Sequence, residues 1–163
     1  MAQTTRRVKW RDVGHIVDSL LKTINDSDNQ YDCIISVNRG GLVIGTCLSY
    51  KLNLPHGVVS INYKENYGRA VDTEMAPEVQ MNMGESISIS QDLKKFRKVL
   101  LFDDSCDTGY LMTHTVNYVK TQMPDAKIDV AVVFLQKQSD FVPTYYYEKM
   151  DGKQLFVFDW ENP

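Results

Sequence analysis

The segment VLLFDDSCDTGY joins an apolar run to groups that suit a phosphorylated ligand. Two adjacent acids, Asp103 and Asp104, follow the apolar run, and Asp107 directly precedes Thr108 and Gly109. Ligands of open α/β sheets bind beyond the carboxyl ends of the strands, so these acids are expected where a ligand lies. The Thr-Gly turn offers backbone N–H groups, a hydroxyl and a helix start, which suit a phosphate dianion. The neighbouring carboxylates suit Mg²⁺ with its waters, or ribose hydroxyls.

Helix capping is the alternative role for these acids. An aspartate just before a helix commonly caps it, and either Asp103 or Asp107 alone fits that role. Capping does not require two neighbouring acids and a third beside Thr-Gly. The string as a whole therefore favours a ligand site.

The same segment resembles the phosphoribosyl pyrophosphate signature of type I phosphoribosyltransferases, in which an apolar strand and two acids precede Thr-Gly. The resemblance implies that the two acids contact the ribose hydroxyls and Mg²⁺, and that the loop wraps the 5′-phosphate. In the purine branch the acid before Thr-Gly assists proton transfer at the base, which implies Asp107 as the catalytic residue. The donor-binding residues implied here are Asp103, Asp104, Ser105, Cys106, Asp107, Thr108, Gly109, Tyr110 and Leu111, with Asp104 and Asp103 at the metal.

Two positions after Thr-Gly depart from the family pattern. The family usually has a small or basic residue and then Thr, whereas this chain has Tyr110 and Leu111. A hydroxyl contact with the phosphate is therefore expected to be lost. Backbone N–H donors do not depend on side chains, so the loop is still expected to bind phosphate, more weakly.

A second motif, Asn-Arg-Gly-Gly at residues 38–41, follows a predicted strand. It resembles the pyrophosphate-binding turn of the xanthine–guanine branch, which implies that Arg39 and Gly40 bind the donor. Glycine permits close backbone approach, and arginine supplies a fork of donors for an anion. The spacing also imitates a P-loop, but Thr46 stands where the lysine is required, which excludes that type of nucleotide site.

The base is expected to contact two later stretches. Lys137 follows a strong apolar strand, where the purine branch places a lysine that contacts the exocyclic oxygen of the base. A solvated lysine at a strand end is the alternative. The tail LFVFDWE is similar to the family's Trp-x-x-x-Pro-Trp-(Asp/Glu), with Leu155 in place of the base-stacking Trp and Asp159 in place of the proline. Phe156 is expected to stack on the base instead, and Trp160 fits a packing role equally well.

Apolar periodicity predicts alternating strands and helices. A strand, a helix and a second strand in succession imply parallel pairing with a crossover helix. We predict helices over residues 10–24, 42–52 and 111–119, and strands over residues 31–37, 58–61, 99–102, 128–135 and 155–158. The predicted fold class is α/β, an open and mainly parallel sheet flanked by helices, which the resemblance identifies as the type I phosphoribosyltransferase fold.

Residues 62–92 interrupt this pattern with polar residues, Gly, Tyr and Met at little periodicity. Long stretches of this kind inside compact domains are often lids or binding loops. The resemblance implies that they form the family's mobile hood over the active site.

Composition predicts a single cytoplasmic domain. The 163 residues, 43% of them hydrophobic, suffice for one core, so residues 1–163 are taken as one phosphoribosyltransferase domain. The net charge of −3 argues against a nucleic-acid partner. Three cysteines without CxxC spacing indicate reduced thiols. No stretch has the length of a membrane span or the pattern of an export signal, so no membrane partner is expected.

The resemblance implies transfer of a phosphoribosyl group from phosphoribosyl pyrophosphate to a nitrogenous base, with Mg²⁺ as cofactor. A 6-oxopurine (guanine, xanthine or hypoxanthine) is the expected base, and a homodimer or homotetramer the expected assembly. Two alternatives remain open: a non-catalytic regulator that senses phosphoribosyl pyrophosphate, and an enzyme of the same fold that acts on a pyrimidine or another base.

Overall fold

The computed structural model describes residues 4–62, 78–81, 95–152 and 154–161. Within them the helices are η1 (Trp10–Asp12), α1 (Val13–Asn25), α2 (Leu42–Leu52) and α4 (Tyr110–Gln122). The strands are β1 (Thr4–Val8), β2 (Cys33–Asn38), β3 (His56–Asn62), β4 (Glu78–Met81), β5 (Lys98–Cys106), β6 (Lys127–Leu135), β7 (Tyr145–Lys149) and β8 (Gln154–Phe158).

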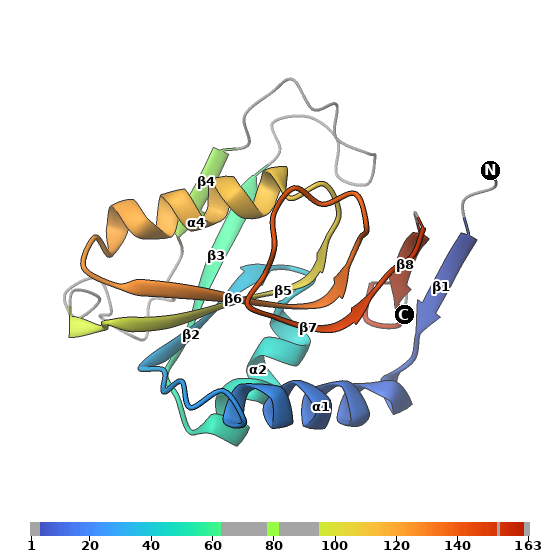
Figure 1. Ribbon diagram of the computed structural model, residues 1–163, viewed down its shortest axis with the longest axis horizontal. Coiled ribbons are helices and arrows are strands. Elements are labelled where there is room, and N and C mark those ends of the chain that lie inside the picture. Colours follow the sequence, from blue (N-terminus) through green and yellow to red (C-terminus); the bar gives the residue numbers. More distant parts are fainter. Residues whose placement is uncertain (1–3, 63–77, 82–94, 153, 162–163) are drawn as a thin grey trace.

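Six of the strands form one sheet in the order β4-β3-β2-β5-β6-β7. Every neighbouring pair is parallel except β3 and β4, which are antiparallel. The predicted open, mainly parallel sheet is therefore confirmed. Since β2, β5 and β6 run in the same direction, their carboxyl ends meet at one edge of the sheet (Figure 1).

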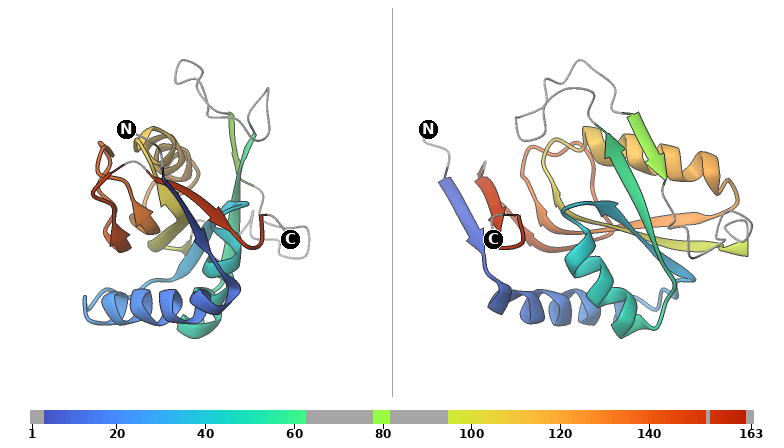
Figure 2. Two further views of the ribbon diagram at one scale, coloured as in Figure 1. Left: turned by 90° about the vertical axis from the view of Figure 1, so that its right-hand side faces the viewer. Right: turned by 180° about the vertical axis from the view of Figure 1, so that it is seen from behind.

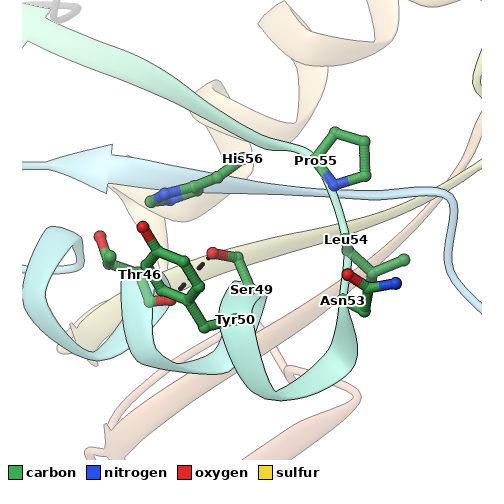
Figure 3. A pocket seen from close by; sticks show the side chains of 7 residues that line it. All are labelled: Thr46, Ser49, Tyr50, Asn53, Leu54, Pro55 and His56. Atoms are coloured by element: carbon green, nitrogen blue, oxygen red, sulfur yellow. Dashed lines mark hydrogen bonds between the residues drawn. The ribbon is translucent and has the colours of Figure 1, made fainter.

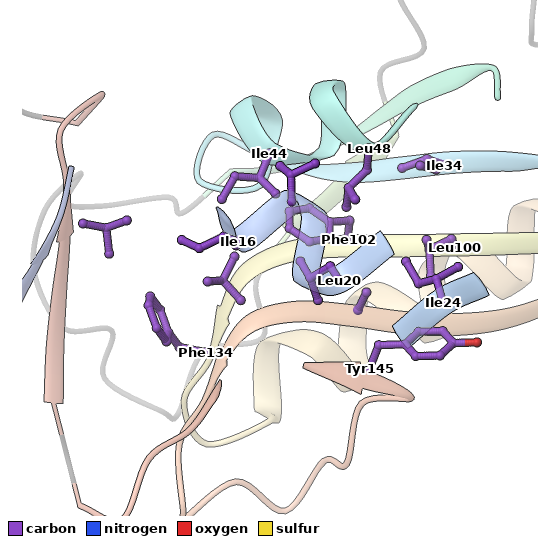
Figure 4. Packing of buried hydrophobic residues seen from close by; sticks show 14 of the residues in the cluster. Ile16, Leu20, Ile24, Ile34, Ile44, Leu48, Leu100, Phe102, Phe134 and Tyr145 are labelled. Atoms are coloured by element: carbon purple, nitrogen blue, oxygen red, sulfur yellow. The ribbon is translucent and has the colours of Figure 1, made fainter. Parts of the chain in front are cut away.

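Helices cover both faces of this sheet, with α4 on one face and α1 and α2 on the other (Figures 1 and 2). Side chains alternate along β2, so Ile35 packs on the α4 side and Ile34 on the α1 side. On the α1 side, Leu20 and Leu48 from the helices meet Phe102 of β5, all without exposed surface (Figure 4). This two-sided core holds the carboxyl ends of the central strands in place.

The first and last strands form a separate two-stranded sheet. β1 and β8 pair in parallel, from Thr4 opposite Gln154 to Val8 opposite Phe158. The predicted strand at residues 155–158 is thus confirmed, but it lies outside the six-stranded sheet. Figure 1 shows this pair beside the end of the sheet at which β5 and β6 finish.

Several boundaries differ from those predicted. β5 continues through both acids to Cys106, because Asp103 pairs with Val132 and Ser105 with Phe134 of β6. The first helix begins later than predicted, after a 3-10 turn in which Trp10 is 58% exposed.

The sequence did not predict β1, β4 or β7. β4 falls inside the interval 62–92, and the rest of that proposed hood, residues 63–77 and 82–92, lies outside the described residues. No helix in the described part of the chain is long and apolar enough to cross a membrane.

Candidate functional site

The two sequence motifs that suit a phosphorylated ligand meet at the carboxyl ends of β2 and β5. A methyl group added at Gly40 would overlap the carboxylate of Asp104. One at Gly41 would lie 2.8 Å from the carbonyl oxygen of Phe102. Only glycine permits this approach of the 38–41 turn to the acids. The peptide bond that leads into the turn, between Asn38 and Arg39, is cis.

The acid pair is buried close to a third carboxylate. Asp103 is 6% exposed and Asp104 is half-buried. Burial, followed by the charge of Asp104, raises the pKa of Asp103 well above its usual range. Burial, followed by the charge of Glu161, raises the pKa of Asp104 to about 6. The backbone N–H of Asp104 donates to Oδ1 of Asp103 at 2.8 Å.

These acids fit a magnesium ion that is shared with a ligand. Mg²⁺ is usually held by one or two protein carboxylates, several waters and substrate phosphates. Among the described residues no group of three or more His, Cys, Asp or Glu side chains is arranged as a metal site. Burial and repulsion both disfavour the charged pair, and a divalent cation would relieve the repulsion. Asp103 and Asp104 are the residues that would hold it.

The Thr-Gly loop connects β5 to α4 and turns at a residue with a positive φ. Gly109 has φ of 88° and precedes the first residue of α4, Tyr110, whose backbone N–H donates to the Thr108 hydroxyl at 3.3 Å. Neither Asp103 nor Asp107 therefore serves as its cap. The first backbone N–H groups of α4 therefore follow directly after the acid-rich end of β5, and their binding of a phosphate stays a prediction.

The two residues that depart from the family pattern contact the core and α4. Leu111 packs into the core on the α4 side. The Tyr110 ring lies 4.4 Å from the His114 ring, one helical turn along α4.

The loop after β6 contacts the Thr-Gly loop through hydrogen bonds. The backbone N–H of Asp140 donates to the carbonyl of Thr108 at 2.9 Å, and Ser139 Oγ lies 3.3 Å from Cys106 Sγ. The side-chain amide of Gln138 donates to Oδ1 of Asp107. Sequence reasoning missed these supporting residues, because neutral side chains in a loop give no local signal of such a role.

The residues expected at the base occupy two different environments. Lys137 is exposed on the loop after β6, and Leu155 is 49% exposed on β8. Phe156 is half-buried, and its ring stacks on that of Phe134 with centroids 4.0 Å apart and planes within 3°. One face of the Phe156 ring is therefore covered by the protein.

The tail residues combine packing with proximity to the acids. Trp160 stacks on Phe158 at 4.7 Å and lies 5.5 Å from the Trp10 ring, which agrees with its alternative packing role. Glu161 accepts a hydrogen bond from the backbone of Phe158 at 3.0 Å. The tail thus brings a carboxylate toward Asp104 across the site.

A separate cavity of about 520 Å³ lies away from these motifs. Thr46, Ser49 and Tyr50 of α2 line it together with the start of β3 at His56 (Figure 3). β3 begins at the edge of the sheet opposite to the one where β5 ends, since all three central strands are parallel. The acids and the Thr-Gly loop do not line this cavity.

Comparison with known proteins identifies the family. Residues 8–162 match the model of the phosphoribosyl transferase domain. The chain belongs to the phosphoribosyltransferase family. The crystal structure of a purine phosphoribosyltransferase from Pyrococcus horikoshii is similar with a TM-score of 0.73 and 25% identity, covering 98% of this chain and 94% of that one.

Two relatives of this family member carry names with different purines. An adenine phosphoribosyltransferase of Thermosipho africanus is 31% identical over 106 residues, which are 58% of this chain and 53% of that protein. A hypoxanthine/guanine phosphoribosyltransferase of Methanothermus fervidus is 29% identical over 118 residues, 72% of this chain and 59% of that protein. The matches thus span between half and two thirds of the length of these two relatives.

Proposed function

We propose that this phosphoribosyltransferase family member transfers the phosphoribosyl group of phosphoribosyl pyrophosphate to a purine base. The observation that carries the proposal is the contact between the Gly40 turn and the Asp104 carboxylate at the sheet edge that also bears the Thr-Gly loop. We assign the arginine-bearing turn to the pyrophosphate of the donor. The acid pair is assigned to its ribose and metal, and the Thr-Gly loop to its 5′-phosphate.

The reaction exchanges one bond at ribose C1 for another. The bond from C1 to the pyrophosphate oxygen breaks, a bond from C1 to a ring nitrogen forms, and the nitrogen's proton leaves. Arg39 binds the departing pyrophosphate, and Asp103 and Asp104 hold the ribose hydroxyls beside a developing positive charge on the sugar. The same acids would hold Mg²⁺, which would supply positive charge beside the leaving group. Asp107, oriented by Gln138, accepts the proton.

Within the purines we propose a 6-oxopurine, with Lys137 at its exocyclic oxygen and Phe156 and Leu155 against its ring. The exposure of Lys137 leaves its ammonium able to approach a ligand. One relative is named for adenine and another for hypoxanthine and guanine, so the base is identified by direct measurement. We further propose that the protein is cytoplasmic and forms a dimer or tetramer. We also propose that it comprises one domain, with residues 62–92 as its hood.

A spectrophotometric screen tests the proposal. The full chain is incubated with phosphoribosyl pyrophosphate and Mg²⁺ and with guanine, xanthine, hypoxanthine, adenine, uracil or orotate in turn. Turnover with a 6-oxopurine is expected. Preference for adenine would correct the base, and preference for a pyrimidine would correct its class. Donor binding without turnover of any base would overturn the enzymatic function in favour of a phosphoribosyl pyrophosphate sensor.

A further inference from the structure

Gln136 connects three parts of the site at the end of β6. Its backbone N–H donates to the carbonyl of Cys106, where the phosphate loop begins, at 2.9 Å. Its side chain is 3% exposed and contacts the first residue of β8. There Nε2 donates to the carbonyl of Gln154 at 2.6 Å, and Oε1 accepts from the Gln154 N–H at 3.3 Å. Lys137 is the next residue along the chain.

These two hydrogen bonds between Gln136 and Gln154 join β8 to the end of β6, as backbone hydrogen bonds join neighbouring strands of a sheet. β8 pairs with β1 and has no ladder to the six-stranded sheet. A glutamine amide offers a donor and an acceptor, as a peptide group does, so Gln136 attaches β8 to the end of β6. The attachment point, Gln154, directly precedes Leu155 and Phe156.

Burial makes this attachment specific. A buried amide without partners carries a desolvation penalty, and so do the backbone groups of Gln154 when they lose theirs. The stacking of Phe156 on Phe134 supports the same placement but does not set the register of β8. The amide therefore fixes the start of β8 to the residue that follows β6, beside the beginning of the Thr-Gly loop.

We infer that Gln136 is a positioning residue that aligns the base-binding strand with the donor-binding loop. It acts through Gln154 and does not touch the substrate. This inference rests on the proposed function. A change at Gln136 should therefore alter use of the base while leaving binding of the donor intact.

The test compares Gln136→Met with a matched control, Gln122→Met, at an exposed glutamine near the end of α4. Methionine keeps the length of the side chain and removes both hydrogen bonds. Their loss should raise KM for the base about tenfold in Gln136→Met, with the donor Kd within about twofold of the parent. Hydrogen exchange of the β8 amides should accelerate, while that of the β5 amides should not. Gln122→Met should behave as the parent in every measurement.

Parallel increases in base KM and donor Kd would overturn the inference, because they indicate a general loss of structure. An unchanged base KM in an active protein would overturn it as well and leave the proposed function intact. A parent that turns over no base would instead count against the proposed function. Hydrogen exchange would then still decide, because unchanged exchange at β8 would show that Gln136 does not hold this strand.

Discussion

The buried acid pair is expected to favour ligand binding and to lower the stability of the folded protein without its ligand. Asp103 is 6% exposed and lies beside Asp104, which is itself close to Glu161. Without a cation, burial and repulsion disfavour their charged forms. With a divalent cation bound, the same charges become favourable ligands. The residues that we propose bind the ligand are therefore expected to destabilise the protein when it is alone.

We predict that Asp103→Asn stabilises the metal-free protein near neutral pH and weakens its Mg²⁺-dependent binding of phosphoribosyl pyrophosphate. Asn keeps the Oδ1 that accepts the Asp104 N–H at 2.8 Å and removes one of the repelling charges. Differential scanning calorimetry should show a rise in Tm of about 2–4 °C for each kcal/mol of repulsion removed. Isothermal titration calorimetry should show the loss of donor affinity. Lower stability together with unchanged affinity would mean that Asp103 has a purely structural role.

The pH dependence of that gain has a definite sign. Burial and the charge of Asp104 raise the pKa of Asp103 well above its usual 3.8 on folding, so the folded protein holds this proton longer than the unfolded chain. The contribution of Asp103 to stability is fully present below 3.8 and is lost as the pH rises through its raised folded pKa. The Tm difference between Asp103→Asn and the parent should therefore shrink in acid. A difference that does not change with pH would exclude an electrostatic cause.

Asp107 is predicted to contribute to turnover more than to binding. Asp107→Asn retains a carbonyl oxygen that accepts the amide of Gln138, but it cannot accept a proton. Turnover with a purine should fall by about 10²–10⁴-fold, the usual contribution of a general base, with little change in donor Kd. Asp140→Asn, at an exposed acid on the adjoining loop, is the matched control. Full turnover in the Asp107→Asn variant would remove Asp107 from the catalytic role.

At the scale of helices and strands, the sequence predicted those elements whose ends depend on nearby residues in the chain. The helix over residues 42–52 is confirmed to the residue, because Asn53 takes a left-handed conformation with φ of 53° and ends it. The strand over residues 128–135 differs by one residue at its start. Continuous apolar runs and turn residues carry enough information for such elements.

Elements that depend on distant partners were not predictable in the same way. β1 has the sequence TTRRV, whose strand conformation depends on its pairing with residues 154–158 at the other end of the chain. β5 extends through the acids only because β6 lies alongside it. Pairing over such sequence separations leaves no periodic signal in a short polar strand such as TTRRV.

The residues of the candidate site differ in the same way: motifs predicted some of them, and others depend on distant parts of the chain. Asp104 and Gly40 were predicted from motifs, and the structure brings them into contact. Gln136 and Gln138 were not predicted, because their roles come from the position of loops and strands that lie far apart in the sequence. The motifs therefore locate the groups that we propose bind the donor, and the structure adds those that contact and support them.

The loop between β5 and α4 depends on a positive φ at Gly109. A side chain there would be strained at φ of 88°, and its Cβ would lie 2.6 Å from the backbone nitrogen of Phe141. We predict that Gly109→Ala loses about 1–3 kcal/mol of unfolding free energy, measured by urea denaturation, and most of its affinity for inorganic phosphate. Gly14→Ala, at a position of α1 with open space, is the control; it should leave phosphate affinity unchanged and should not lower stability, because alanine favours a helix more than glycine does. Retained phosphate binding in Gly109→Ala would exclude this turn as the phosphate site.

At the scale of the whole molecule, the two ends of the chain form a unit of their own beside the main sheet. β1 and β8 pair with each other, and polar contacts add to the pairing. Arg6 donates to Glu148 of β7 at 2.8 Å, which links this unit to the six-stranded sheet. Arg7 donates to Asp159 at 2.8 Å and so joins the strand at one end of the chain to the turn at the other.

Asp159 stands where the resembling family has a proline, and its contacts suggest a structural use for that change. Its carboxylate accepts from Arg7 and, at 3.1 Å, from the backbone N–H of Trp10. Its own N–H donates to the carbonyl of Val8 at 3.0 Å, a bond that proline cannot make. The acid therefore fastens the end of β1 to the end of β8.

We predict that Asp159→Ala loosens the β1–β8 pair without changing the main sheet. Hydrogen exchange of β1 and β8 amides should accelerate while that of β5 and β6 amides stays constant, because the lost contacts lie only within the terminal unit. The bond from Arg7 lowers the pKa of Asp159, so its contribution is present above 3.8 and is lost as the pH falls through the lowered folded pKa. The parent should therefore approach the variant's exchange pattern in strong acid. Asp18→Ala, at an exposed acid of α1, should change neither pattern. Equal acceleration in β5 and in β8 would mean that the two sheets open together, and the terminal strands would then be part of one cooperative unit with the core.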